Sequence, residues 1–350
     1  MKIKKIYLCV LCVLGVVISC VIFCRVSLAE ELFQFKEENG KRLVLTDCAT
    51  PVFVYCFDVV EHENVPKKDS RRTAGCYIHP LYGINGEILT DNAPSDHFHH
   101  HGVFWTWPHV GVHNKDGKVK HYDLWTSNTN LKQRFVRWID KKVTENTASF
   151  EVENGWFVGN PEDKNKIMSE RVKVVVNRIK IDDGLRSRAI DFQITLKPID
   201  NPIALRGSEG KSYGGLSIRF KPYIPENERK NRNATAKRSE INIITTPDGI
   251  AKNDLPETPL AWADYTSRFD NRTDSSGAAI FVPKNHPDYP PTWLTRYYGP
   301  LCVGYPGVKE KILQPNKEFK LNYRIWIHDG IVTTQQIKKF HDEYNNDNKD

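Results

Sequence analysis

Histidine is concentrated in one stretch of this 350-residue chain. Seven of the twelve histidines lie within residues 97–121, and four of these fall in the segment DHFHHHGVFWTW at residues 96–107. Neutral imidazole binds zinc, copper, iron or nickel, and imidazole also transfers protons near neutral pH. The segment therefore predicts a pocket that uses histidine as a metal ligand or as an acid–base group. A structural histidine network is the alternative.

The backbone of this segment decides which histidines act together. If residues 97–105 form a strand, successive side chains point to opposite faces. His97, His99 and His101 then share one face, and His100 points the other way. The Phe-Trp-x-Trp run that follows supplies aromatic faces, which stack on a sugar ring while polar groups bond to its hydroxyls. The pattern is therefore compatible with a carbohydrate pocket.

The charge pattern argues against a nucleic acid partner. The net charge of +7 is spread mostly singly along the chain, and the densest basic stretch is ERKNRNATAKR at residues 228–238. Asn and Glu interrupt this stretch and no aromatic RNA-binding signature accompanies it, so we expect a solvated loop. The glycine-rich GSEGKSYGG at residues 207–215 lacks the spacing of a phosphate-binding loop, so we expect no nucleotide site.

The N-terminus has the pattern of a targeting segment. The positive MKIKK precedes a long apolar run, and small residues precede a cleavage site after Ala29. We expect a signal peptide at residues 1–29 and one β-sandwich domain at residues 30–350, exported to the periplasm or the extracellular space. The alternatives are a membrane anchor at residues 6–24 and a lipoprotein modified at Cys20. If the segment is not cleaved, we expect the protein to contact the membrane only through it.

Four of the eight cysteines lie in the targeting segment. An even number in an exported chain permits disulfides, with three connectivities, and buried free thiols are the alternative. No CxxC pair remains, so a zinc ribbon is not expected. The cysteines of the expected domain are Cys48, Cys56, Cys76 and Cys302.

The rest of the chain has the pattern of short strands. Segments such as TPVFVYCFDVV, TASFEVENGWFV and SGAAIFVP are rich in β-branched and aromatic residues, and FQFKEENGKRLVLTD contains an Asn-Gly hairpin turn. Only residues 333–346 show a helical period, with a Thr as N-cap and with Ile337, Phe340 and Tyr344 expected to dock. We therefore expect an all-β fold, a large antiparallel sandwich with a short C-terminal helix.

Several segments together resemble a bacterial family catalogued as methane oxygenase PmoA. The histidine-rich segment at residues 96–107 and the HYDLW element at residues 121–125 match the family pattern. The matching residues are Asp96, His97, His99, His100, Gly102, Trp105, Asp123 and Trp125. YGGLSIRF, AWADYTS and HPDYPPTWLTRYYGP match in the same order at Arg219, Trp262, Asp264, Tyr265, His286, Pro287, Trp293, Arg296 and Gly299. Phe98, His101 and Leu294 depart from the family pattern. His101 is therefore a weaker candidate for a functional role than His99 or His100.

The resemblance implies an exported protein similar to those of polysaccharide-degrading bacteria. Its strand pattern fits the supersandwich of galactose-mutarotase-like proteins, which is a fold-level analogy and does not define chemistry. A multi-span membrane oxygenase is not implied, because beyond the N-terminus no apolar run approaches 18 residues.

These patterns leave three hypotheses for function. The first is a protein that acts on or binds carbohydrate, with a catalytic set in which His99 and His100 transfer protons and Asp96 or Asp123 orients a ring nitrogen. Its substrate-binding set is Trp105, Trp125, Arg219, Asp264, His286, Trp293 and Arg296. The second is a metal-dependent oxidoreductase with copper, iron or zinc bound by His97, His99 and His286. The third is a non-catalytic carbohydrate-binding or envelope protein.

Overall fold

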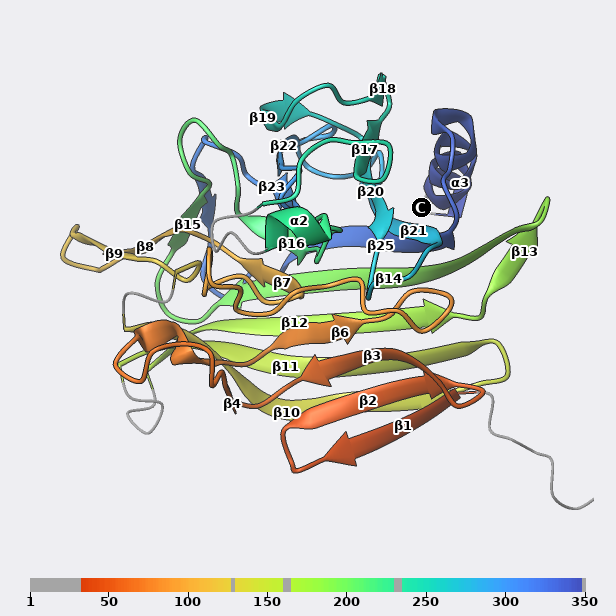
Figure 1. The fold of residues 1–350 in the computed structure, drawn as a ribbon. Coiled ribbons are helices and arrows are strands. Elements are labelled where there is room, and N and C mark those ends of the chain that lie inside the picture. Colours follow the sequence, from red (N-terminus) through yellow and green to blue (C-terminus); the bar gives the residue numbers. More distant parts are fainter. Residues whose placement is uncertain (1–32, 127–129, 160–164, 230–234, 348–350) are drawn as a thin grey trace, which may run out of the picture.

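The computed structural model describes residues 33–126, 130–159, 165–229 and 235–347, and the expected targeting segment at residues 1–29 lies outside them. Two large antiparallel sheets pack face to face (Figure 1). This confirms the expected all-β sandwich.

The first sheet has nine strands. Their spatial order is β1 Phe33–Glu38, β2 Arg42–Asp47, β3 Thr50–Cys56, β6 Tyr77–Leu81, β7 Val103–Thr106, β16 Gly215–Arg219, β23 Pro300–Gly304, β22 Thr292–Thr295 and β19 Leu255–Pro259. The first hairpin turns at Asn39 and Gly40, which both have positive φ, as the Asn-Gly signal predicts. Strands that are distant in sequence, such as β7 and β16, become neighbours in this sheet.

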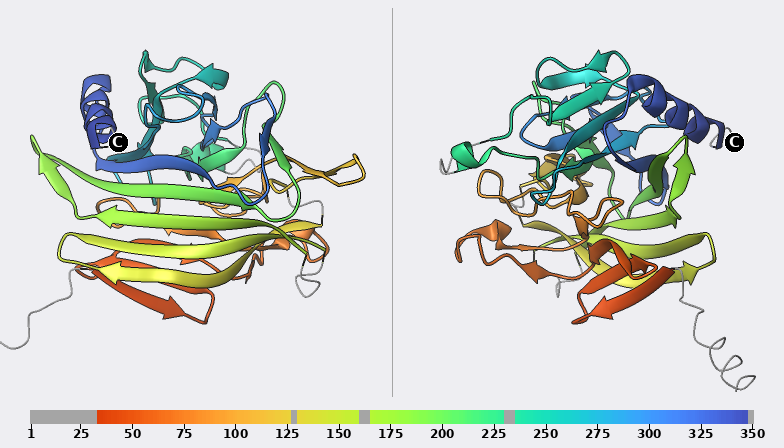
Figure 2. Two further views of the ribbon diagram at one scale, coloured as in Figure 1. Left: turned by 180° about the vertical axis from the view of Figure 1, so that it is seen from behind. Right: turned by 45° about the vertical axis from the view of Figure 1, so that its right-hand side comes forward.

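The second sheet has ten strands. Their order is β10 Leu131–Val143, β11 Thr147–Val158, β12 Lys166–Asn177, β14 Leu185–Pro198, β25 Phe319–Asp329, β21 Ser275–Phe281, β20 Trp262–Arg268, β17 Ile243–Thr246 and β18 Gly249–Ile250, and β13 Lys180–Asp182 pairs with β14. The view from behind in Figure 2 shows the long strands β10, β11, β12 and β14 side by side.

Smaller elements complete the described residues. A four-stranded sheet contains β24 Lys311–Leu313, β15 Ile203–Arg206, β8 His109–His113 and β9 Val119–Tyr122, and a two-stranded sheet pairs β4 Val60–Glu61 with β5 Thr73–Ala74. The helices are a 3₁₀ turn at Ser70–Arg72, α2 Glu226–Arg229 and α3 Thr334–Asp347.

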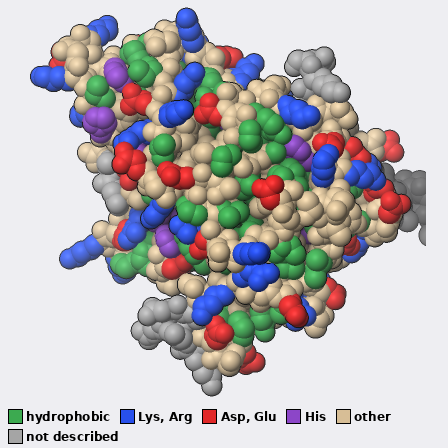
Figure 3. All heavy atoms as spheres, turned by 90° about the horizontal axis from the view of Figure 1, so that it is seen from above, with side chains coloured by type: hydrophobic (Ala, Val, Ile, Leu, Met, Phe, Trp, Pro, Cys, Tyr) green, Lys and Arg blue, Asp and Glu red, His purple; other side chains and the backbone are tan. Residues whose placement is uncertain are grey.

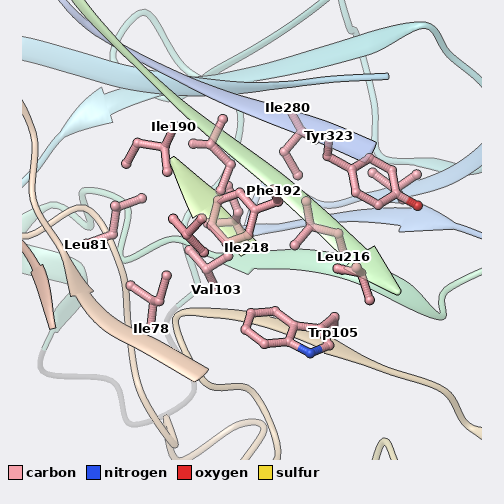
Figure 4. Close-up of a cluster of buried hydrophobic side chains, with 14 of the residues drawn as sticks. Ile78, Leu81, Val103, Trp105, Ile190, Phe192, Leu216, Ile218, Ile280 and Tyr323 are labelled. Atoms are coloured by element: carbon pink, nitrogen blue, oxygen red, sulfur yellow. The ribbon is translucent and has the colours of Figure 1, made fainter. Parts of the chain in front are cut away.

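The hydrophobic core lies between the two large sheets (Figure 4). It draws Ile78, Leu81, Val103, Trp105, Leu216 and Ile218 from the first sheet, and Ile190, Phe192, Ile280 and Tyr323 from the second. Complete burial of each such side chain stabilises the fold by roughly 1.5–3 kcal/mol. Because side chains alternate along each strand, the side chains that face inward form the core, and those that face outward can contribute to a functional site.

One carboxylate is buried within this core. Glu170 of β12 accepts hydrogen bonds from the indole nitrogens of Trp105 and Trp156, both at 2.8 Å, and from the amides of Gln133 and Asn154. Burial raises the pKa of Glu170, and these hydrogen bonds act in the opposite direction. The four donor groups supply the polar contacts that a buried carboxylate requires.

The C-terminal helix forms where the helical period predicts it. The hydroxyl of Thr333 accepts from the backbone N of Gln336, and the Gln336 side chain accepts from the backbone N of Thr333, which is a capping box. Ile337, Phe340 and Tyr344 pack with aromatic residues on the outer face of β20, β21 and β25. The predicted N-cap and the predicted docking residues are confirmed.

The cysteines of the described residues are free thiols. Cys56, Cys76 and Cys302 are buried, and Cys48 is exposed. Burial raises the pKa of each of the three buried thiols, so they remain protonated and unreactive at neutral pH.

The surface carries mixed charge. Figure 3 shows acidic and basic side chains interspersed with hydrophobic ones over the face that lies uppermost in Figure 1. This distribution agrees with the singly spaced lysines and arginines of the sequence.

Candidate functional site

The histidine segment is not a strand. Residues 94–100 form two consecutive turns, with the amide of His97 bonded to the carbonyl of Pro94 and the amide of His100 bonded to that of His97. The strand β7 begins only at Val103. The expectation of a strand over residues 97–105 is therefore confirmed for residues 103–105 and wrong for residues 97–102, because Pro, Ser and Asp ahead of the histidines favour turns over an extended backbone.

The turns bring together three histidines that a strand would separate. The ring centroids of His97 and His100 are 4.7 Å apart with nearly parallel planes, and His99 lies 5.5 Å from His97 and 4.7 Å from His100. We call these three residues the histidine cluster. His101 points elsewhere: its Nδ1 lies 2.9 Å from the side-chain oxygen of Asn92, and its ring stacks on His62. The predicted grouping of His101 with His97 and His99 is wrong.

Gly102 connects the cluster to β7. Its φ is +52°, and a Cβ at this position would lie 2.1 Å from the carbonyl oxygen of Ile78. Only glycine fits this close approach and this backbone conformation. Its carbonyl also accepts a hydrogen bond from the amide of Arg219, so the same residue aligns β7 with β16.

Arg219 at the end of β16 fixes the carboxylate beside the cluster. Its Nη2 donates to both carboxylate oxygens of Asp96, at 3.0 and 2.8 Å, and its guanidinium lies over the ring of Tyr298 at 4.7 Å. The Nη1 of this buried side chain is also 3.5 Å from Nδ1 of His100. The predicted ligand-binding arginine thus belongs to the site, although Asp96 of the same chain already engages it.

Asp96 faces His97 rather than the other two histidines. Its Oδ2 lies 3.0 Å from Nδ1 of His97, off the line of an ideal hydrogen bond. Partial burial raises the pKa of Asp96, but the contacts with His97 and Arg219 outweigh this effect and lower the pKa to about 2. The carboxylate therefore stays ionised throughout the neutral range. The ring of His97 also stacks on Tyr298, with 5.2 Å between centroids.

The other two histidines of the cluster are neutral bases. Burial, reinforced by His97 and Arg71, lowers the pKa of His99 to about 4. Burial also lowers the pKa of His100 well below its usual value, with His99 and Arg219 adding to the effect. In the described residues, Nδ1 of His99 has no hydrogen-bond partner. The prediction that a carboxylate orients His99 is not supported by these contacts.

Aromatic residues close the inner side of the cluster. Trp125 lies against His100 and packs on Phe104 and Tyr213, with ring centroids 5.0 and 4.5 Å away. It is buried, so it supports the histidines from behind. Phe104 stacks on His100 at 5.8 Å. Because side chains alternate along β7, it is Phe104, and not the predicted Trp105, that faces the cluster.

A cleft of about 970 Å³ adjoins the cluster. Asp96, Arg219 and Tyr298 line this cleft and also contact the histidines, so one wall is common to both. The other charged and aromatic side chains that line it are Asp91, Lys221, Tyr223, Arg268 and Asp270.

Sequence reasoning missed three important residues of this cleft. Lys221 follows Arg219 by two residues, and side chains two apart in an extended chain share a face, so this signal was present. Tyr298 lies two residues after Arg296, within the segment HPDYPPTWLTRYYGP that resembles the family pattern. Arg268 ends a strand whose pattern contained no comparable signal.

The predicted site residues Trp105, Trp293 and Asp123 form hydrogen bonds within the fold. The indole of Trp105 donates to Glu170 inside the core, and that of Trp293 donates to the carbonyl of Leu260 at 2.8 Å. The carboxylate of Asp123 accepts from the backbone N and the hydroxyl of Thr126, so it caps a turn. The predictions that Trp105 and Trp293 line a substrate pocket are wrong, because their strands turn these side chains into the protein.

Three other predicted site residues lie outside the cleft wall. Asp264 is fully buried and pairs with His328 at 2.9 Å. His286 lies against the rings of Tyr305 and Tyr323. Arg296 pairs with Asp254 at 3.2 Å. The predicted substrate-binding roles of Asp264, His286 and Arg296 are therefore not supported by their positions.

The predicted metal site does not assemble. Within residues 33–347, apart from the gaps noted above, no three His, Cys, Asp or Glu side chains converge in an arrangement that could hold a metal ion. The predicted ligands His97 and His99 are close, but His286 is engaged with the two tyrosines on a different part of the fold. The donor set of the oxidoreductase hypothesis therefore does not fit.

Comparison with known families gives one match. Residues 43–342 match a family of unknown function, DUF6807. The comparison with curated proteins gives no match. The resemblance to the family catalogued as methane oxygenase PmoA is not tested by these results and stays a prediction.

The solved structures that match this chain have low sequence identity to it. A galactose mutarotase related enzyme from Lactobacillus acidophilus is 11% identical, with a TM-score of 0.35 and coverage of 85% of this chain and 97% of that chain. A GH36 alpha-galactosidase from Geobacillus stearothermophilus is 10% identical, with a TM-score of 0.35 and coverage of 85% and 39%. Likenesses with such low TM-scores carry no argument about activity.

Proposed function

The chain belongs to DUF6807, a family of unknown function, and we propose that it binds a carbohydrate in the cleft and transfers a proton to or from it through His97. The observation that carries this proposal is the shared wall. Asp96 and Tyr298 line the cleft and contact His97, and Arg219 lines the cleft and holds Asp96. A ligand in the cleft would therefore lie beside an imidazole–carboxylate pair.

The lining suits a sugar. Tyrosine rings offer flat apolar faces for the C–H face of a sugar ring, and Tyr298 and Tyr223 both line the cleft. The charged side chains around them supply donors and acceptors for hydroxyl groups. A volume of about 970 Å³ is within the upper range of small-molecule sites and accommodates more than one sugar unit.

The proposed chemistry follows from the Asp96–His97 contact. An ionised carboxylate beside Nδ1 favours the tautomer that carries its proton there, which leaves Nε2 free to accept a proton. The His97 side chain is 34% exposed, so a ligand can reach it. His99 and His100 are neutral at neutral pH and pack beside it. The catalytic histidine of this proposal is thus His97, which the sequence patterns assigned to a metal.

Export is a further part of this proposal. Its support is the pattern of residues 1–29, which lie outside the described residues. Among the helices that the structure describes, none has the length and hydrophobicity needed to cross a membrane.

The test is a glycan-binding screen followed by calorimetry and turnover assays on residues 30–350. Tyr298→Leu should weaken sugar binding by at least about tenfold. His97→Gln should retain binding but lose turnover by a factor on the order of 10² or more. His109→Gln, at an exposed histidine of β8, is the matched control. Unchanged binding in Tyr298→Leu would overturn the proposed cleft, and retained turnover in His97→Gln would leave a binding protein.

A further inference from the structure

The cleft contains three acidic and three basic side chains, which differ in how they are paired. Asp96 is engaged with Arg219. Asp270 accepts a hydrogen bond from the backbone N of Ile88 at 2.7 Å. These two carboxylates therefore already have partners within the protein.

The third acidic side chain is Asp91, and its surroundings raise its pKa. Asp91 accepts a hydrogen bond from the backbone N of Asn92 at 2.9 Å. Burial raises the pKa of Asp91, although Arg219 and Lys221 partly offset this effect. The acidic side of the cleft is therefore occupied by internal contacts.

The two remaining basic side chains are not paired in this way. In the part of the chain that the structure describes, neither Lys221 nor Arg268 forms a salt bridge with an acidic side chain, and Nε of Arg268 is buried without a hydrogen-bond partner. A buried donor without a partner destabilises the folded state. A ligand acceptor in the cleft would give the Arg268 guanidinium a partner.

These two cations come from different sheets. Lys221 lies two residues beyond the end of β16 in the first sheet, and Arg268 is the last residue of β20 in the second. Both line the same cleft, together with Arg219. Three cationic groups thus converge on the cleft. Among the three carboxylates that line it, only Asp96 forms a direct ion pair with one of them, Arg219.

The C-terminal end of the basic stretch at residues 228–238 adjoins the cleft. Thr235 and Ala236 line the cleft, and the residues that follow them directly are Lys237 and Arg238. Basic side chains close to a concave surface raise the local concentration of anions. The described end of this stretch, which the sequence patterns assigned to a solvated loop, therefore borders the site.

We propose that the ligand is an anionic carbohydrate, bearing a carboxylate or a sulfate ester, and that Lys221 and Arg268 bind its anionic group. This inference rests on the proposed carbohydrate function of the cleft and names the substrate class. Arginine matches the fork geometry of either oxyanion, and lysine supplies a point charge. Tyr298 and Tyr223 line the same cleft and would contact the sugar ring.

The experiment is isothermal titration calorimetry with matched pairs of probes. One pair is an oligogalacturonate and its carboxyl-reduced neutral counterpart, and the other is a sulfated galactan oligosaccharide and its desulfated counterpart. We expect at least one anionic member to bind about tenfold or more tightly than its neutral partner. We also expect this advantage to shrink with added salt. The pair that shows the advantage identifies the anionic group.

Variants then locate the effect. Arg268→Gln and Lys221→Gln should each remove most of the advantage of the anionic probe, because each should lower the affinity for this probe by a much larger factor than the affinity for its neutral counterpart. Arg137→Gln and Lys320→Gln, at exposed residues outside the cleft, are the matched controls. Thermal unfolding checks that each variant is folded, and Lys221→Gln serves alone if Arg268→Gln fails to fold, because Lys221 is exposed.

The outcomes separate the two proposals. Equal affinity for the charged and neutral members of both pairs, with binding lost in Tyr298→Leu, would overturn the anionic class and leave the carbohydrate site. Binding of no sugar in either this experiment or the glycan screen would overturn the carbohydrate function itself. An anionic advantage that survives both substitutions would overturn the roles of Lys221 and Arg268.

Discussion

Arg219 Nη2 donates to both carboxylate oxygens of Asp96, at 3.0 and 2.8 Å, across 123 residues of sequence. The arginine ends a strand of the first sheet, and the aspartate lies in the turns that carry the histidines. This pair links the histidine cluster to the cleft, so its loss should affect both the fold and the function.

Asp96→Asn should lower the free energy of unfolding at pH 7 by about 2 kcal/mol, less than for a fully buried pair because the carboxylate is partly exposed to solvent. The pKa of Asp96 is lowered from 3.8 to about 2 in the folded protein. Its stabilisation is therefore complete above pH 3.8 and is lost as the pH falls through 2. Urea unfolding of both proteins at several pH values measures this difference.

The matched control is Asp342→Asn, at a half-buried residue of α3 that pairs with Lys338, which should change stability by less than about 0.5 kcal/mol. A difference between wild type and Asp96→Asn that stays constant down to pH 2 would contradict the lowered pKa.

Acid should destabilise the protein well above the range in which carboxylates titrate. Burial lowers the pKa of His62, His79, His99 and His286 from 6.5 to about 4. The unfolded chain binds these protons first, so stability is present above pH 6.5 and falls as the pH drops from 6.5 to 4. Denaturant midpoints between pH 7 and pH 4 measure this fall.

His99→Asn should flatten this slope, because it removes one of the groups that titrate on unfolding. His121→Gln, at an exposed position on β9, should leave the slope as it is. Stability that does not change between pH 6.5 and pH 4 would show that these histidines are not held neutral by burial.

Gly102→Ala should strongly lower the free energy of unfolding or prevent folding. The new Cβ would lie 2.1 Å from the carbonyl oxygen of Ile78, and φ is +52°. We expect a loss of more than about 3 kcal/mol, since backbone must move and strain adds to the clash. Gly117→Ala is the control, because its φ is +81° but no atom lies within 4 Å. It should lose only about 1 kcal/mol, and equal losses in urea unfolding would refute the steric argument.

Glu170→Gln should destabilise the core by about 3 kcal/mol. The new amide would direct an N–H group toward the four donor groups that now converge on the carboxylate, and a buried donor without an acceptor is unfavourable. Urea unfolding followed by tryptophan fluorescence measures this loss, since Trp105 and Trp156 are direct neighbours. Glu151→Gln, on the neighbouring strand, should have little effect. Unchanged stability in Glu170→Gln would mean that the carboxyl is already protonated.

The sequence by itself determined the elements. Side-chain alternation and turn residues predicted strands where they occur, such as the segment TASFEVENGWFV, which is β11 Thr147–Val158. The helical period and the capping residues predicted α3 and the three side chains that dock it. These signals are local, because a period of two or 3.6 residues and a cap involve only near neighbours.

Only the tertiary structure decided which of the chemically able residues meet. The histidines were visible in the sequence, but the turns at residues 94–100 replaced the expected alternation and turned His101 away. Asp264 and His286 matched the family pattern, yet their strand and loop place them outside the cleft wall. Arg268 and Lys221 reach one cleft from two sheets, because the spatial order of strands, and not their order in the chain, determines which side chains are neighbours.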